Sequence, residues 1–212
     1  MTPLATAQLD VLKDAVLIRT DHHRYFLGPV ELPSLNRIMK AGGLADDFSG
    51  IPPMILERKR TNGEHVHKAC ELYLKGDLDE GTVWNDALPY FVAFKRYHDS
   101  IGNPKARATE RPVCCRVRLF ACTPDVEWDH DGSVDEIKTS LKLSGYIGIQ
   151  TAAQVIAIAG EYDARPRRAV QLKKDGTFFV RALTDFTDYA AFDAALEVFR
   201  YKEAHKLLGK SE

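Results

Sequence analysis

The sequence lacks any apolar run as long as the roughly 20 residues that a membrane-spanning helix requires. Its first ten residues, MTPLATAQLD, also lack the basic and apolar segments of a secretory signal. These two absences argue against a membrane protein and against a secreted one. They predict a protein of the cytoplasm.

Cysteine is scarce, and its four positions form no CxxC pair: Cys70, Cys114, Cys115 and Cys122. Paired CxxC spacings are the usual mark of structural zinc sites and of redox motifs. The pattern therefore favours reduced, mostly buried thiols, as expected in the cytoplasm. A disulfide set or a zinc site is the weaker alternative.

An excess of charge of either sign is also absent, because 29 basic residues stand against 30 acidic ones. The chain therefore lacks the overall positive charge that is typical of nucleic-acid-binding proteins. A basic groove could still attract nucleic acid, because the local electrostatic field acts there. With 45% hydrophobic and 28% charged residues, the composition is that of a soluble globular protein. The 212 residues suit one domain, 1–212, without repeats.

Hydrophobic periodicity and turn residues predict a mixed order of strands and helices. An N-terminal hairpin and helices occupy about 1–100, and a sheet with further helices occupies about 110–206. The predicted strands are 15–19, 24–28, a β-rich block at 111–123, and a hairpin at 168–183 around Asp175-Gly176. The predicted helices are 32–43 with Ser34 as N-cap, 64–75, 88–100, 145–162 and 188–208, with 51–63 as a connector. The fold class is α/β (α+β), with a central mixed β-sheet flanked by helices.

The stretch TPDVEWDHDGSVDEIKTS, residues 123–140, is unusually acidic and contains a strong Asp-Gly turn signal. A two-residue turn at Asp131-Gly132 predicts that Val126 faces Ile137. Alternation then places Asp125, Glu127, Glu136 and Lys138 on one face, and Val126, Trp128 and Ile137 on a core face.

In this register Asp125 and Glu136 are diagonal neighbours, with Cβ atoms about 7–8 Å apart. Two carboxylates at that separation can reach one cation at metal–oxygen distances of about 2.0–2.1 Å, as magnesium prefers. Glu127 and Glu136 would lie directly opposite each other, which is unfavourable without a cation or a basic neighbour. A solvated acidic hairpin is the alternative, and a loop of odd length would put Asp125 on the wrong face.

An ordered set of motifs resembles the PD-(D/E)XK signature of the restriction-endonuclease-like nucleases. The set is Gly63 to His67 on a helix, Pro124-Asp125, Glu136-Ile137-Lys138, and a following helix with Gln150. This order is similar to the RecB-like branch, particularly small phage and prophage members, and the likeness spans about 32–205. It implies a restriction-endonuclease-like core.

The resemblance implies roles for individual residues. Asp125 and Glu136 would bind the metal together with the Ile137 backbone carbonyl and His67. Lys138 would orient or help deprotonate the attacking water and stabilise charge on the phosphate. Of the two histidines spaced by two in this helix, only one can face the hairpin, and His67 is chosen over His65.

The expected substrate contacts lie around this centre. Glu71, one helical turn after His67, matches the helix acid of the family. Gln150 would contact DNA or steady the lysine, and basic residues of the connector, Arg58, Lys59 and Arg60, are candidate phosphate contacts. Gln154 stands where relatives often have tyrosine, which puts the DNA-contact role of this helix in doubt. The cysteines do not sit where relatives bind an iron–sulfur cluster, so no cluster is expected.

The resulting prediction is a Mg²⁺- or Mn²⁺-dependent deoxyribonuclease, and an exonuclease in phage DNA recombination, replication or degradation. Hard oxygen ligands select these metals, and a histidine ligand favours manganese slightly. The expected partner is DNA, and a recombinase or a single-strand-binding protein is a possible further partner. An oligomer is also possible. The expected location is the cytoplasm of a bacterial or phage-infected cell. The alternative is a catalytically silent nucleic-acid-binding or interaction protein on the same fold. A nuclease for RNA or branched DNA is a third reading.

Overall fold

A computed structural model describes residues 12, 14–21 and 24–209 of the chain. The opening segment MTPLATAQLD lies outside the described residues. Among those described, no helix is both long and apolar enough to cross a membrane.

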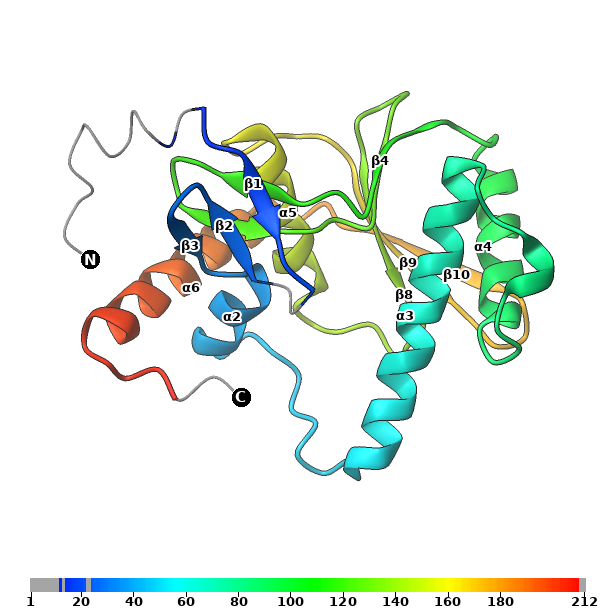
Figure 1. Ribbon diagram of the computed structural model, residues 1–212, viewed down its shortest axis with the longest axis horizontal. Coiled ribbons are helices and arrows are strands. Elements are labelled where there is room, and N and C mark those ends of the chain that lie inside the picture. The colour runs from blue at the N-terminus through cyan, green and yellow to red at the C-terminus, as the bar shows by residue number, and fades with distance from the viewer. Residues whose placement is uncertain (1–11, 13, 22–23, 210–212) are drawn as a thin grey trace.

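The centre of the described fold is a five-stranded sheet with the strand order β10-β9-β8-β7-β4 (Figure 1). Its strands are β4 (Ala106–Thr109), β7 (Val126–Trp128), β8 (Val134–Lys138), β9 (Arg167–Leu172) and β10 (Phe178–Ala182). Strands β8 and β9 run parallel and the other pairs antiparallel, so the sheet is mixed. Helices flank it, and the predicted α/β (α+β) class with a central mixed sheet is confirmed.

Two smaller sheets lie beside the central one in the described part of the chain. One is the antiparallel set β1 (Leu17–Arg19), β2 (Tyr25–Leu27) and β3 (Val30–Leu32). The other pairs β5 (Val113–Cys115) with β6 (Phe120–Cys122). The predicted N-terminal hairpin is thus confirmed and gains a third strand.

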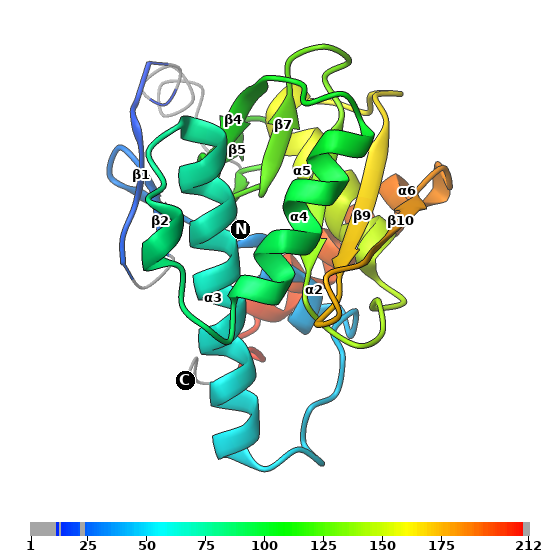
Figure 2. The ribbon, with the colours of Figure 1, turned by 90° about the vertical axis from the view of Figure 1, so that its right-hand side faces the viewer.

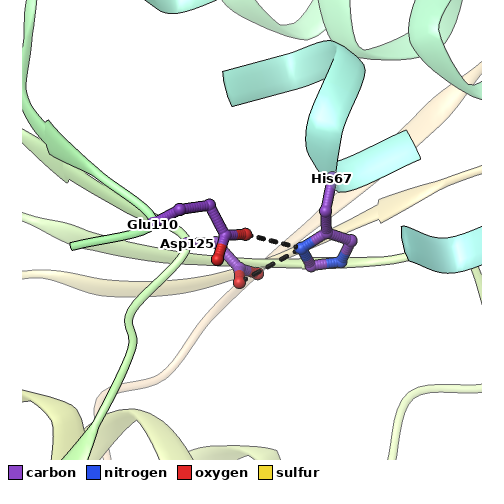
Figure 3. Close-up of side chains that lie close together, drawn as sticks. All are labelled: His67, Glu110 and Asp125. Atoms are coloured by element: carbon purple, nitrogen blue, oxygen red, sulfur yellow. Dashed lines mark hydrogen bonds and ion pairs between the residues drawn. The ribbon is translucent and has the colours of Figure 1, made fainter. Parts of the chain in front are cut away.

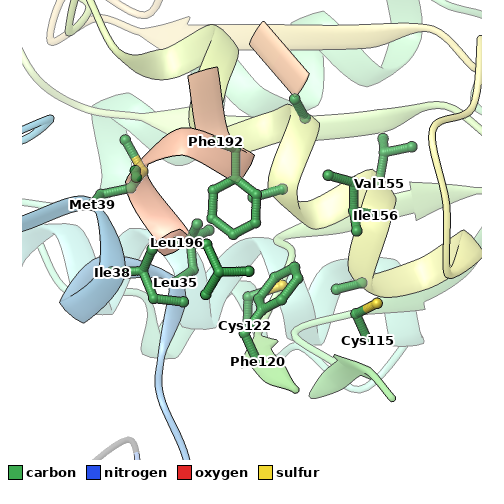
Figure 4. Packing of buried hydrophobic residues seen from close by; sticks show 14 of the residues in the cluster. Leu35, Ile38, Met39, Cys115, Phe120, Cys122, Val155, Ile156, Phe192 and Leu196 are labelled. Carbon is green, nitrogen blue, oxygen red and sulfur yellow. The ribbon is translucent and has the colours of Figure 1, made fainter. Parts of the chain in front are cut away.

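Both faces of the central sheet are covered by helices (Figure 2). Helices α3 (Pro53–Lys75) and α4 (Leu88–Ser100) pack on one face, in a cluster that includes Val66, Phe91, Phe94, Trp128, Ile137 and Val170. Helix α5 (Ile147–Ala159) packs on the other face, and α6 (Thr187–Ala204) and α2 (Leu35–Ala41) pack behind it. Their shared cluster includes Ile38, Val134, Val155, Ile156, Phe192 and Leu196 (Figure 4). The acidic face of the 123–140 hairpin is therefore buried against α5 rather than solvated.

Helix ends follow the sequence signals in most places. The Ser34 side chain caps α2 by accepting a hydrogen bond from the Arg37 N–H (3.2 Å). Helix α4 has the predicted bounds, and the predicted helices at 145–162 and 188–208 correspond to α5 and α6. The β9–β10 hairpin turns at Asp175-Gly176, where the Lys173 N–H donates to the Thr177 carbonyl (2.9 Å).

The predicted connector at 51–63 is wrong, because helix α3 begins at Pro53 instead of near residue 64. Proline is favoured in the first turn of a helix, where its missing N–H has no intrahelical partner. Gly76 ends the helix in a left-handed conformation, with φ of 77°. The basic residues at 58–60 thus lie on a rigid helix and not on a loop.

The turn of the acidic hairpin is also longer than predicted. The Trp128 N–H donates to the Ser133 carbonyl (3.0 Å), so these two residues close a loop of residues 129–132. The predicted two-residue loop at Asp131-Gly132 would have paired residue 130 with Ser133. The register between β7 and β8 shifts by two residues.

The shift preserves which side chains share a face. Val126 lies opposite Asp135, where the sequence predicts Ile137. Because side chains alternate with a period of two, an even shift keeps every side chain on its predicted face. Asp125 and Glu136 consequently stay on the same face, on neighbouring strands.

The opposite face of β8 holds a second buried carboxylate with its own partners. Asp135 accepts hydrogen bonds from the hydroxyl of Tyr97, from Trp128 Nε1 (2.6 Å) and from Arg168 Nε (2.7 Å). Burial and the adjacent Asp135 raise the pKa of Tyr97, so Tyr97 stays protonated and donates. This network joins α4 to the sheet and lies behind the candidate site.

Candidate metal centre

Three side chains from distant parts of the chain converge at one edge of the sheet (Figure 3). His67 Nδ1 lies 3.1 Å from Glu110 Oε1 and 3.2 Å from Asp125 Oδ1. One ligand atom from each of the three residues lies within 4.8 Å of the other two. One imidazole and two carboxylates at these distances could hold a divalent cation.

Each of the three side chains is fixed by the element that carries it. His67 projects from the middle of α3, whose neighbouring Val66 and Cys70 are buried against the sheet. Glu110 directly follows β4, and its N–H donates to the Asp125 carbonyl (3.0 Å). Glu110 adopts φ of 47°, in the left-handed region that non-glycine residues rarely occupy.

Asp125 directly precedes β7 and is only 7% exposed. Its Oδ2 accepts a hydrogen bond from the Ile137 N–H (2.6 Å), which leaves Oδ1 turned to His67. The contact that Ile137 makes here is thus through its amide, whereas the family resemblance implies a role for its carbonyl. The amide fixes the rotamer of the aspartate.

Glu136, the second carboxylate expected to bind the metal, is not part of the three-residue cluster. It lines a cavity together with Asp125, and three side chains donate hydrogen bonds to its carboxylate. Lys138 Nζ and Gln150 Nε2 each donate to Oε1 at 2.6 Å, and Gln154 Nε2 donates to Oε2 at 2.6 Å. Glu136 is only 3% exposed, so these contacts offset its desolvation. Gln150 therefore contacts the glutamate directly, as does Gln154.

The electrostatics of the centre favour protonated bases. Burial disfavours a charge on His67, but Asp125 and Glu110 outweigh burial and hold the pKa of His67 well above its ordinary value. Burial likewise opposes the ammonium of Lys138, and the fields of Glu136 and Asp125 raise its pKa nonetheless. The centre thus sets three carboxylates against two cationic side chains, with Asp125 and Glu136 buried and Glu110 half-buried.

The cluster opens into two connected hollows. A cavity of about 280 Å³ is lined by Asp125, Glu136 and Lys138 together with His67, Glu110, Gln150 and Gln154, and by Arg19, Tyr25, Ser34, Leu35, Asn36, Cys122 and Thr123. A shallower groove of about 630 Å³ runs along α3. Arg19, His67 and Glu110 line both, so the cluster lies where the groove meets the cavity.

Several residues expected at the site have other contacts. Glu71 lines the groove but is bound by two lysines of its own helix, Lys68 (2.9 Å) and Lys75. It is not part of the three-residue cluster. His65 is exposed and packs against Trp84 (ring centroids 4.4 Å), on a different side of α3 from His67.

The three basic residues of α3 also differ from one another. Arg60 lines the groove and forms ion pairs with Glu57 and Glu64, each at 2.7 Å. Arg58 pairs with Asp86 across to the segment before α4 (3.1 Å). Lys59 is exposed on the same helix. Of the three, only Arg60 lines the groove or the cavity described above.

Glu127 does not face Glu136, contrary to the predicted register. It lies opposite Val134, and arginines surround its buried carboxylate. Arg107 and Arg111 approach it at 3.3 Å and 3.2 Å, and Arg165 at 3.5 Å. The acidic face thus has two parts. One is Glu127, which three arginines neutralise, and the other is the pair Asp125 and Glu136.

The cysteines are free thiols, and three of them are buried as predicted: Cys70, Cys115 and Cys122. Cys114 is half-buried. Burial is the main cause that raises the pKa of Cys70 and of Cys122, and nearby carboxylates add to it. These thiols therefore remain protonated beside the acidic centre.

Glu110 is the residue that sequence spacing missed. It matches no part of the motif set, and only the pairing of β4 with β7 brings it to Asp125. The local signal that the sequence offers is the position of Glu110 directly before Arg111-Pro112, a typical place for an element to end.

Neither the protein-family models nor the curated protein sequences contain a match to this chain. What the chain does must therefore be inferred from the geometry of this centre.

Proposed function

We propose that this protein is a Mg²⁺- or Mn²⁺-dependent nuclease that hydrolyses DNA phosphodiester bonds. The observation that carries the proposal is the convergence of His67, Glu110 and Asp125 beside Glu136 and Lys138 in one cavity. The resemblance of the motif order to the PD-(D/E)XK nucleases of the RecB-like branch points to the same chemistry.

The donor atoms fit a hard divalent cation. Carboxylate oxygens are the ligands that magnesium and manganese prefer, and one imidazole shifts the preference toward manganese. His67, Glu110 and Asp125 would hold the cation, and Glu136 would approach from the neighbouring strand. A bound cation would supply positive charge to the phosphate and lower the pKa of a water molecule.

The remaining residues position this chemistry. The Ile137 amide holds Asp125, and Gln150 and Gln154 hold Glu136. Lys138 carries an ammonium at the cavity wall, with 29% of its side chain exposed. A charged lysine there suits the orientation of an attacking water and the stabilisation of negative charge that develops on the phosphate.

The RecB-like resemblance implies an exonuclease, so we propose a DNA chain end as the substrate and a role in phage DNA recombination, replication or degradation. A cavity of about 280 Å³ can admit a single phosphodiester group together with a cation. DNA is the proposed partner, and a recombinase or single-strand-binding protein would act with it in the bacterial cytoplasm.

Cleavage of end-labelled linear DNA and closed circular DNA tests the proposal, each in single- and double-stranded form. Magnesium, manganese and a chelator are compared. Lys138→Ala should reduce the rate by roughly 10²–10⁴-fold, the range typical of a positioned acid–base group, while manganese binding persists. Lys142→Ala, which removes an exposed lysine four residues further on, is the matched control and should cut at the wild-type rate.

Each outcome bears on a different part of the proposal. Metal-dependent loss of linear DNA alone establishes an exonuclease, and cutting of circles establishes an endonuclease. Unchanged cleavage by Lys138→Ala would show that this centre is not the active site. A wild type that binds DNA but cuts nothing with either metal would leave the catalytically silent binding protein as the better description.

A further inference from the structure

Gln154 is an amide buried in an apolar part of helix α5. It is only 1% exposed, and its neighbours Ala153 and Val155 are fully buried. Its Nε2 donates to Glu136 Oε2 (2.6 Å), whereas its Oε1 is buried without a hydrogen-bond partner in the described part of the chain. A buried acceptor without a partner costs free energy, so packing alone does not account for a glutamine here.

The two oxygens of Glu136 are not equivalent. A carboxylate offers about four lone-pair sites, two on each oxygen. Among the described residues, Oε1 accepts from both Lys138 and Gln150, and Oε2 accepts from Gln154 alone. By this count Oε2 is the oxygen with a lone pair still available to a cation, and Gln154 is the side chain bonded to it.

The two glutamines act from one helix. Gln150 and Gln154 are four residues apart on α5 and therefore share a face of the helix, one turn above the other. Each donates to a different oxygen of Glu136, so together they define the plane of the carboxylate. Rotation of that plane would break both hydrogen bonds.

We propose that Gln154 is a positioning residue that, with Gln150, clamps Glu136 and presents its Oε2 to the divalent cation of the centre. This inference rests on the proposed metal-dependent function. RecB-like relatives often have tyrosine at this position. Here the residue would support a metal ligand and would not contact DNA. Gln154 acts only through Glu136 and touches neither the cation nor the substrate.

Gln154→Met tests the inference, because methionine keeps the length and helix preference of glutamine but cannot donate a hydrogen bond. Thr151→Val is the matched control. Thr151 is equally buried on α5 and donates to the Gly148 carbonyl (3.0 Å), away from the cavity. The measurements are manganese affinity by calorimetry, kcat and KM on linear DNA, and Tm without metal.

Gln154→Met should weaken manganese binding and lower kcat by about 10–100-fold, the usual effect of losing a partner of a metal ligand. KM for DNA should stay unchanged, and Tm should change little, because the loss of the hydrogen bond to the buried Glu136 and the removal of the unpartnered acceptor offset each other. Thr151→Val should lower Tm and leave manganese affinity unchanged.

Wild-type manganese affinity in Gln154→Met would overturn the inference while leaving the nuclease proposal in place. A lower Tm with unchanged affinity would assign Gln154 to packing and also overturn it. If the wild type binds manganese but cuts no DNA, the nuclease proposal fails, and calorimetry still decides whether Gln154 positions a ligand. A wild type that binds no manganese would overturn both.

Discussion

Glu110 and Glu71 are the two candidates for an acidic metal ligand beside His67. A pair of matched substitutions distinguishes them. Glu110 Oε1 lies 3.1 Å from His67 Nδ1, whereas Glu71 is held by Lys68 and Lys75. Glu110→Gln and Glu71→Gln each remove one negative charge and keep the size of the side chain. Only the first should remove a metal ligand.

The expected magnitude follows from ligand linkage. At a metal concentration 100 times Kd, binding stabilises the fold by about 2.7 kcal/mol. A tenfold weaker Kd, a conservative figure for a lost carboxylate ligand, lowers this stabilisation by about 1.3 kcal/mol. For a chain of this length about 1 kcal/mol corresponds to 2–4 °C in Tm. Glu110→Gln should therefore reduce the metal-induced rise in Tm by about 3–5 °C.

The assay is thermal unfolding at matched manganese and chelator conditions for the wild type and both variants. Without metal, Glu110→Gln should lower Tm only modestly, because His67 loses one of its two carboxylate partners while the amide oxygen can still accept its hydrogen bond. Glu71→Gln should retain the full metal response. The reverse pattern, a response lost in Glu71→Gln and kept in Glu110→Gln, would refute the centre described here.

Two further predictions concern the environment of the centre. The raised pKa of His67 means that its contacts with Asp125 and Glu110 stabilise the metal-free protein fully below about pH 6.5, the unfolded pKa of histidine. This stability should be lost as pH rises through the folded pKa, and titration of Tm against pH should show the slope in the wild type and not in His67→Gln. On the other face of the sheet, Tyr97→Phe removes a hydrogen bond to the buried Asp135 and should cost about 1.5–3 kcal/mol in chemical denaturation. Manganese affinity should stay unchanged in Tyr97→Phe, and a weaker affinity would show that the two buried carboxylates are coupled through β8.

The sequence predicts elements well where punctuation and periodicity agree. Helix α4 has both a buried stripe and clear ends, and its bounds are correct. The first half of α3 carries no apolar stripe, since residues 53–60 are exposed, and periodicity therefore gives no signal there. The start signal at Pro52-Pro53 was present but reads equally well as a loop.

The candidate site is harder to predict because it combines local and long-range geometry. Asp125 and Glu136 share a face for any even loop length, so their placement survives the wrong turn. Glu110 depends on the β4–β7 pairing, which no local spacing encodes. The choice of Glu71 followed helix periodicity, and the same periodicity places Lys68 and Lys75 beside it.

The backbone of Glu110 bears on what this centre costs the protein in stability. A residue other than glycine held at φ of 47° costs about 1 kcal/mol or more, and glycine or asparagine at that position would relieve the cost. A lineage that no longer needed a carboxylate here could gain stability by a single substitution. Under the proposed function, glutamate at this position gives up backbone stability in exchange for a carboxylate beside His67.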